Sequence, residues 1–287
     1  MTKVDSLLVE DIRNIINSGC KDISPRPKYK DGKPAHTYFV THNMRQYDLS
    51  KGEFPITTLR PIAWKSAIKE ILWIFQDQTS DLSLLNEKYN NKIWNDWESK
   101  DMPGTIGCRY GHTVKEYDLL NTRVLNDIKE NPYGRYHIMN LWQEEEFIRS
   151  DGLKPCAYET IWSVRGDYLD MFLNQRSGDM LVASGAGMWN EVQYAALLMM
   201  VAKHTGYKPG KFTHFVANEQ IYNRHFNAAN ELIHRYQETL DYWDGNESHP
   251  FMFFNPKSDN FYEFTINDFE LINYKPIKPQ LILELGI

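Results

Sequence analysis

Residues 155–179 read PCAYETIWSVRGDYLDMFLNQRSGD, and this stretch decides how we expect the chain to fold. Its two runs, 157–164 and 168–175, are rich in aromatic and β-branched residues, which are typical of strands. The residues between them, Arg165-Gly166-Asp167, are a short turn signal. The stretch therefore predicts a β-hairpin that starts just after Cys156 and ends at a dense polar run.

Helical and strand-like patterns are intermixed on both sides of this hairpin. They show no regular strand–helix–strand alternation, so we expect an α+β fold and not a doubly wound parallel sheet. Apolar spacing and turn residues predict helices at about 4–18, 61–76, 119–130, 191–205 and 227–243, and further strands at 36–49, 135–142 and 212–217.

The chain contains no internal repeat, low-complexity tract or Gly/Ser-rich linker. We therefore expect residues 1–287 to form a single domain. Residues 77–107 are polar, contain tryptophans and are less regular, so a smaller excursion or lid is expected there.

The composition excludes several classes of protein. Hydrophobic residues make up 42% and charged residues 24% of the 287 residues, which is typical of a globular chain and not of a disordered one. The net charge of −6 argues against a surface that binds polyanions. The longest apolar run, Ala195 to Ala202, is too short for a membrane span, which needs about 20 residues.

Cysteine usage indicates a reducing compartment. The three cysteines, Cys20, Cys108 and Cys156, are too few and too widely spaced for a disulfide framework or a zinc site. No secretory signal is recognisable at the N-terminus, so we expect a cytoplasmic location. The cysteine spacing leads us to expect no metal.

Glu70 is the first residue that the pattern leaves unexplained. On a helical wheel of 61–76, Glu70 falls outside the polar sector and among apolar side chains. A buried carboxylate needs partners or a raised pKa, and both are marks of proton-transfer sites. An ion pair with an unseen arginine, or a place at the helix edge, is the more common explanation of such a residue.

Cys156 and Arg176 stand at the two ends of the hairpin. A lone cysteine is usually a small buried hydrophobe, and a nucleophile would need a nearby cation to favour its thiolate. Arg176 could supply that cation only if the strand register or a bulge brings the two together. The polar run 175–179 could bind a phosphate or form a surface turn. Asn190 could be a helix N-cap or a ligand contact.

Several segments, taken in order, resemble the thymidylate synthase family, especially the form found in low-GC Gram-positive bacteria. They are RPKYKDG at 26–32, FPITTLR at 54–60, KEILW at 69–73, GTIGCRYG at 104–111, Pro155-Cys156, QRSGD at 175–179, Asn190 with Tyr194, and Gln220-Ile-Tyr222. The resemblance spans nearly the whole chain. It implies a fold with a large mixed or antiparallel sheet packed against helices, and a homodimer formed through the sheet.

The resemblance also implies a reaction. Methylenetetrahydrofolate, as carbon and hydride donor, converts dUMP to dTMP and leaves as dihydrofolate, without a metal. Cys156 is implied as the nucleophile that adds to C6 of the uracil, Glu70 and Tyr110 as proton-transfer groups, and Arg176 as the group that activates the thiol.

The remaining roles follow from the same resemblance. Asn190 would recognise the uracil edge, and Gln220 and Tyr222 the ribose. Arg26, Arg176 and Ser177 would bind the phosphate, together with Arg135 from the partner subunit. Trp94 and Trp97 would face the folate, and Asp179 would contact both substrates.

This sequence departs from the family pattern at several positions. Tyr136 stands where a second phosphate-binding arginine is usual, Gln220 where a histidine is usual, and Leu59 where many members have a folate-binding lysine. Ala157 replaces a common histidine after the nucleophile, and residues 184–189 form a longer, small-residue loop that we expect to be flexible and to border the pocket.

Two alternatives stay open. A dUMP hydroxymethylase on the same fold would use the same cysteine and folate but add water in place of hydride. An RNA-binding regulatory protein is the non-enzymatic alternative. The negative charge and the absence of an RNA-binding motif argue against it, so nucleic acid is not expected as the main ligand.

Overall fold

A computed structural model describes residues 2–241 and 249–287. Its centre is a mixed sheet whose strands lie in the order β1-β2-β7-β5-β4-β3, with β6 added beside β7. The strands are β1 (Cys20–Lys21), β2 (Thr37–Asp48), β3 (Ile138–Asn140), β4 (Ala157–Arg165), β5 (Tyr168–Gln175), β6 (Gly178–Asp179) and β7 (Lys208–Tyr222). The expected α+β class is confirmed, and so is the hairpin, which is formed by β4 and β5.

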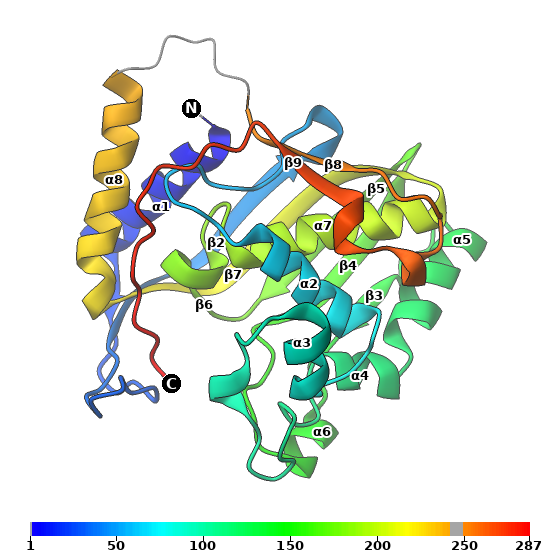
Figure 1. The fold of residues 1–287 in the computed structure, drawn as a ribbon, viewed down its shortest axis with the longest axis horizontal. Coiled ribbons are helices and arrows are strands. Elements are labelled where there is room, and N and C mark those ends of the chain that lie inside the picture. Colours follow the sequence, from blue (N-terminus) through cyan, green and yellow to red (C-terminus); the bar gives the residue numbers. More distant parts are fainter. Residues whose placement is uncertain (1, 242–248) are drawn as a thin grey trace.

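Helices cover one face of this sheet (Figure 1). The α-helices of the described residues are α1 (Lys3–Ser18), α2 (Trp64–Phe75), α3 (Leu82–Tyr89), α4 (Gly111–Glu116), α5 (Asn126–Glu130), α6 (Glu144–Arg149), α7 (Trp189–Thr205) and α8 (Phe226–Asp241). In Figure 1, α7 crosses the sheet with α2 beside it, and α1 lies next to α8. The C-terminal part adds a two-stranded ribbon, β8 (Phe251–Phe254) and β9 (Phe269–Ile272).

The helix α7 lies at the centre of the hydrophobic core. It is buried on nearly all sides, which fits a helix that is apolar all round. The chain enters it at Met188, which occupies the N-cap position, and leaves it at Gly206, whose φ of 82° is typical of a glycine that ends a helix. The expected N-cap role of Asn190 is therefore wrong, because Asn190 already lies inside the first turn.

Two expected strands differ in length from the structure. The strand expected at 212–217 belongs to the longer β7, which pairs with β2 along almost its whole length. The strand expected at 135–142 is only β3. The helix expected at 119–130 is confirmed, because these residues are helical throughout, with a π-helical turn at Asn121–Leu125 followed by the short α5. The helix expected at 227–243 is α8, and residues 242 and 243 lie outside the described residues. Within the described ranges, no helix combines the length and apolarity that a membrane span needs.

The outer face of the sheet is only partly covered by this chain. Buried and half-buried residues alternate along β5, so that Leu173 faces the helices and Phe172 faces outward. Phe172 stacks on Phe215 of β7, and Met44 of β2 is 62% exposed. A half-exposed apolar sheet face of this kind is typical of a surface that is covered by another molecule.

Candidate active site

A pocket of about 490 Å³ opens where the hairpin, the start of α7 and the end of β7 meet. Among the described residues, all the predicted site residues except Arg135 line it. They come from sequence positions far apart: Arg26, Glu70, Trp94, Trp97, Tyr110, Cys156, Arg176, Ser177, Asp179, Asn190, Gln220 and Tyr222. Arg135 is exposed and lies outside the pocket of its own chain.

A break in the strand pairing brings Cys156 next to Arg176. Ala157 pairs with Gln175, but Glu159 pairs with Asn174, so β4 carries one extra residue at this end of the hairpin. The Arg176 amide donates to the Cys156 carbonyl at 2.9 Å, and the guanidinium Nη2 lies 3.5 Å from Sγ. The bulge is thus the feature that allows the contact between thiol and guanidinium.

The rest of the guanidinium is anchored by backbone. Arg176 Nε donates to the carbonyl of Pro155 and Nη2 to that of Lys154, both at 2.9 Å. The arginine is therefore fixed against the segment that carries the cysteine, and one edge of it remains available to a ligand in the pocket.

The environment of Cys156 combines burial with positive charge. Burial raises the pKa of the thiol, while Arg176 and then Arg26 act in the opposite direction. The expected lowering by Arg176 is present, but burial outweighs it. Tyr110 accepts the Cys156 amide hydrogen at its hydroxyl, 3.1 Å away, and burial raises the pKa of this phenol well above its usual range.

Glu70 is 5% exposed and lies in the middle of α2. Its carboxylate accepts two indole N–H groups, from Trp94 at 2.9 Å and from Trp189 at 2.8 Å. Burial raises the pKa of Glu70, and the two indole hydrogen bonds act against that shift. Neither of the alternative explanations holds, because the residue is not at a helix edge and its described partners are neutral.

Asp179 lines the pocket, and one of its two carboxylate oxygens has no hydrogen-bond partner. Oδ1 accepts the amides of Leu181 and Val182, so it caps the turn that follows β6. Oδ2 is buried without a hydrogen-bond partner, 3.7 Å from His225 Nδ1. Burial raises the pKa of the carboxyl. A buried acceptor without a partner fits a ligand that brings its own N–H donor.

The longer loop is not flexible in the way the sequence predicts. Ser184, Ala186 and Met188 are fully buried, and residues 184–188 do not line the pocket. At Gly187 φ is +70°, and a Cβ there would lie 2.3 Å from the Thr57 amide nitrogen. The loop is therefore packed into the core, and only its last residue, Trp189, reaches the pocket.

Of the other departures, Gln220 lines the pocket, whereas Leu59 and Tyr136 do not. Leu59 is fully buried in the core, so the position of the usual folate-binding lysine does not reach the pocket lining. Tyr136 is 77% exposed and, like Arg135, does not line this pocket.

Several residues that line the pocket have no role that the sequence predicts. Trp189 and Gln175 stood inside quoted segments, and the adjacent Asn190 and Arg176 were the available signals for them. Leu285 and Gly286 also line the pocket, because Ile287 exchanges two backbone hydrogen bonds with Lys28. No sequence pattern links these C-terminal residues to the site.

Within the described part of the chain, no group of His, Cys, Asp and Glu side chains could hold a metal ion. The pocket instead joins a cysteine, a fixed guanidinium, a buried carboxylate and an amide. This combination is typical of an enzyme that works through a cysteine nucleophile.

Comparisons with known proteins agree with this class. The family described as thymidylate synthase matches residues 8–285. Thymidylate synthases of Streptococcus sanguinis and Streptococcus suis are 48% and 49% identical to this chain, over all of both sequences. The solved structure of thermostable thymidylate synthase A from Bacillus subtilis is 33% identical, with a TM-score of 0.84 over 99% of both chains.

The chain belongs to the thymidylate synthase family. The activity of this family is the reductive methylation of dUMP to dTMP, with methylenetetrahydrofolate as co-substrate.

Proposed function

We propose that this chain converts dUMP to dTMP in the pocket around Cys156, with methylenetetrahydrofolate as carbon and hydride donor. The observation that carries the proposal is the contact between the Cys156 thiol and the Arg176 guanidinium, 3.5 Å apart, in a pocket that also holds Glu70 and Asn190. This arrangement supplies a nucleophile, its activating cation and a proton-transfer group in one place.

The first step is addition of Cys156 Sγ to C6 of the uracil. The electron pair of the C5–C6 double bond moves toward O4, so that C5 becomes nucleophilic and bonds to the folate methylene. The thiol must lose its proton first, and burial raises its pKa. Arg176 stabilises the thiolate that forms.

Proton transfer falls to two neighbouring residues. Glu70 orders water against the pyrimidine, and the Tyr110 hydroxyl, next to the Cys156 amide, assists removal of the C5 proton through water. The electron pair left by that proton expels the folate amine, so the bond between the methylene and the folate nitrogen breaks and an exocyclic methylene remains on the pyrimidine, which is still bonded to Sγ at C6. Hydride from the folate then reduces this methylene to the methyl group, and Sγ leaves C6 as the C5–C6 double bond re-forms. Dihydrofolate and free thiol are the other products.

The nucleotide is held at three points. Arg26, Arg176 and Ser177 bind the phosphate, Gln220 and Tyr222 the ribose, and Asn190 the uracil edge, and each of them lines the pocket. Asp179 and the tryptophans Trp94 and Trp97 lie where the folate would pack. The partnerless Oδ2 of Asp179 and the edge-on contact of the two indoles, 5.8 Å between centroids, fit a flat ligand with N–H donors.

The proposal includes a homodimer, with Arg135 of each chain completing the phosphate site of the other. It is supported by the half-exposed sheet face and by the position of Arg135 outside its own pocket. We further propose that residues 1–287 act as one cytoplasmic domain. In it, the excursion at 77–107 bears on ligand entry, since it contributes Trp94 and Trp97 to the pocket wall.

The test is incubation of the purified protein with dUMP and methylenetetrahydrofolate, followed by mass spectrometry of the pyrimidine and absorbance of dihydrofolate. We expect dTMP and dihydrofolate in equal amounts. Cys156→Ala should abolish both, while Cys20→Ala, at an exposed cysteine outside the pocket, should abolish neither. Hydroxymethyl-dUMP without dihydrofolate would instead identify a hydroxymethylase, and turnover by Cys156→Ala would overturn the mechanism.

A further inference from the structure

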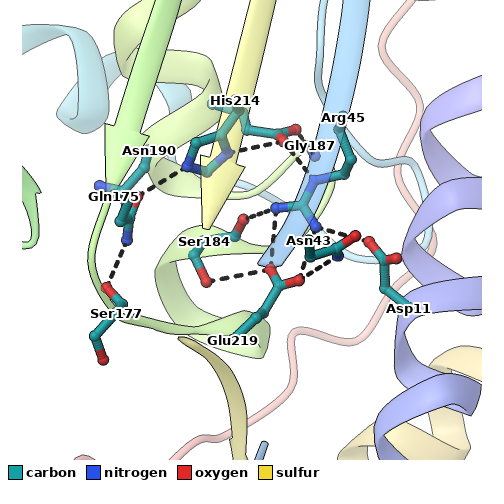
Figure 2. Close-up of polar contacts among 11 residues, drawn as sticks. Asp11, Asn43, Arg45, Gln175, Ser177, Ser184, Gly187, Asn190, His214 and Glu219 are labelled. Atoms are coloured by element: carbon teal, nitrogen blue, oxygen red, sulfur yellow. Dashed lines mark hydrogen bonds and ion pairs between the residues drawn. The ribbon is translucent and has the colours of Figure 1, made fainter. Parts of the chain in front are cut away.

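A chain of polar side chains runs from the pocket into the core (Figure 2). Gln175 Nε2 donates to Asn190 Oδ1 at 3.2 Å, and Gln175 Oε1 faces His214 Nε2 at 3.0 Å. On its other side, His214 Nδ1 lies 3.1 Å from Glu191 Oε1. Asn190 and Gln175 line the pocket, but His214 and Glu191 do not, and both are fully buried.

Backbone carbonyls fix the direction of this chain at both ends. Gln175 Nε2 also donates to the Ser177 carbonyl at 3.0 Å, and a carbonyl can only accept. At the other end, Gln193 Nε2 donates to the Ala67 carbonyl, so that Gln193 Oε1 accepts from Asn190 Nδ2 at 3.0 Å. Asn190 is therefore held with Oδ1 toward Gln175 and Nδ2 toward Gln193.

His214 reinforces the same direction. Gln175 Oε1 and the Glu191 carboxylate can only accept, so both ring nitrogens of His214 carry a hydrogen when the two contacts are hydrogen bonds. The ring is kept in place by Glu191, which also accepts Arg45 Nε at 2.8 Å and the Gly187 amide at 2.7 Å. Arg45 in turn bonds Glu219 and Asp11 and donates to the Ser184 carbonyl (Figure 2). The buried 184–188 loop thus contacts the two residues, Glu191 and Arg45, that hold the histidine ring in place.

We propose that His214 and Gln193 are positioning residues that set which end of the Asn190 amide meets each part of the pyrimidine. The inference rests on the proposed function of Asn190 as the contact to the base. In the fixed orientation, Asn190 Oδ1 keeps a lone pair for an N–H donor, and Nδ2 keeps a hydrogen for a carbonyl. This pair matches N3–H and O4 of uracil and mismatches the N3 acceptor and amino group of cytosine.

Two amide variants of His214 separate this role from a structural one. In His214→Gln the side-chain amide reaches the position of Nε2 and can still donate to Gln175. In His214→Asn it reaches only the position of Nδ1, so that Gln175 Oε1 loses its donor. His137→Asn is the matched control, since His137 is also fully buried and bonded to a carboxylate, Asp127, but lies outside the pocket.

The measurement is the affinity for dUMP and for dCMP by calorimetry, with kcat and KM for dUMP alongside it. We expect the dUMP preference to fall by about tenfold in His214→Asn, the size that one misdirected hydrogen bond carries. KM should rise more than kcat falls. His214→Gln and His137→Asn should keep the preference. An unchanged preference in folded His214→Asn, or an equal loss in His214→Gln, would overturn the inference.

A second variant covers the case in which His214→Asn does not fold. Gln175→Glu keeps the acceptor toward His214 but replaces the donor toward Asn190, so the Asn190 amide should turn and the dUMP preference should fall or reverse. A preference equal to that of the wild type would contradict the relay. Because binding is measured apart from turnover, a wild-type protein that prefers dUMP but makes no dTMP would count against the proposed reaction alone.

Discussion

At the scale of single residues, the candidate active site contains buried ionisable side chains, and a few hydrogen-bond partners determine the pKa of each. Glu70 shows this most clearly, because burial raises its pKa while two indole N–H groups stabilise the charged form. Because these two effects oppose each other, each indole hydrogen bond influences the pH at which the Glu70 carboxylate is protonated. Removing one of them should therefore change the pH at which the enzyme works.

Trp189→Phe tests this influence. The change keeps an aromatic ring but removes one hydrogen bond to the carboxylate, so the pKa of Glu70 should rise further. If the ionised form is the active one, the acid limb of the kcat/KM profile should move to higher pH, by about one unit. Trp97→Phe is the control, since Trp97 lines the same pocket but packs on Trp94. A uniform loss of rate with no shift of the limb would contradict the assignment.

The residues could be predicted from the sequence to different degrees. Glu70 stood out on the helical wheel alone, because an acid among apolar neighbours is a local signal. The contact of Cys156 with Arg176 was conditional, since it needed a bulge that no pattern in the sequence announces. His214 was not predicted at all. It lies in β7, and its partners Gln175 and Glu191 are brought to it only by the packing of β5 and α7 on that strand.

At the scale of elements, the periodicity of apolar residues and the turn signals predicted the main helices and the hairpin. They did not predict where strands end, because the length of a strand depends on the neighbouring strands that pair with it. The strand β7 extends well beyond its apolar centre because β2 and β5 pair with it on both sides. The loop before α7 was the larger error. Small residues suggested flexibility, whereas in the structure they permit close packing, with Gly187 against the backbone of Ile56 and Thr57.

Gly187→Ala should therefore be costly. The substitution places a Cβ at 2.3 Å from the Thr57 nitrogen, in a residue whose φ is +70°. Backbone strain alone costs about 1–2 kcal/mol, and the steric overlap adds to it. Gly206→Ala is a matched control, because its φ of +82° carries the same strain but no atom lies within 4 Å of the new Cβ. Urea unfolding compares the two, and equal losses of unfolding free energy would show that the loop is not tightly packed.

At the scale of the whole molecule, one buried cluster of charges joins α1, β2, α7 and β7. Arg45 is its centre and pairs with Asp11, Glu191 and Glu219. Burial, and to a lesser degree Glu219, raises the pKa of Asp11 to about 6, although Arg45 acts against this shift. A carboxyl with a raised pKa binds its proton more tightly in the folded state than in the unfolded one.

The sign of the resulting pH dependence is fixed. The stability from Asp11 is fully present below its unfolded pKa, near 3.8, and is lost as the pH rises through about 6. Asp11→Asn should therefore gain stability relative to the wild type over that window, by up to about 3 kcal/mol. Chemical unfolding at several pH values measures the difference. Asp31→Asn is the control, since the pKa of that exposed residue is lowered. The difference in unfolding free energy between this variant and the wild type should therefore stay constant over the same pH range. A flat difference for Asp11→Asn would refute the raised pKa.

The largest scale is the proposed dimer, and Arg135 tests it through the site itself. A mixture of Cys156→Ala and Arg135→Ala chains forms heterodimers with two different sites. If Arg135 serves the partner's pocket, one site of each heterodimer carries both defects and the other is wild type, so an equal mixture should recover about a quarter of the full activity. If Arg135 served its own pocket, each site would keep one defect and no activity would return.

Refolding the two inactive variants together, with each refolded alone as the control, distinguishes these outcomes. Failure to recover activity in a demonstrable heterodimer would place the role of Arg135 within its own chain, or outside the reaction altogether.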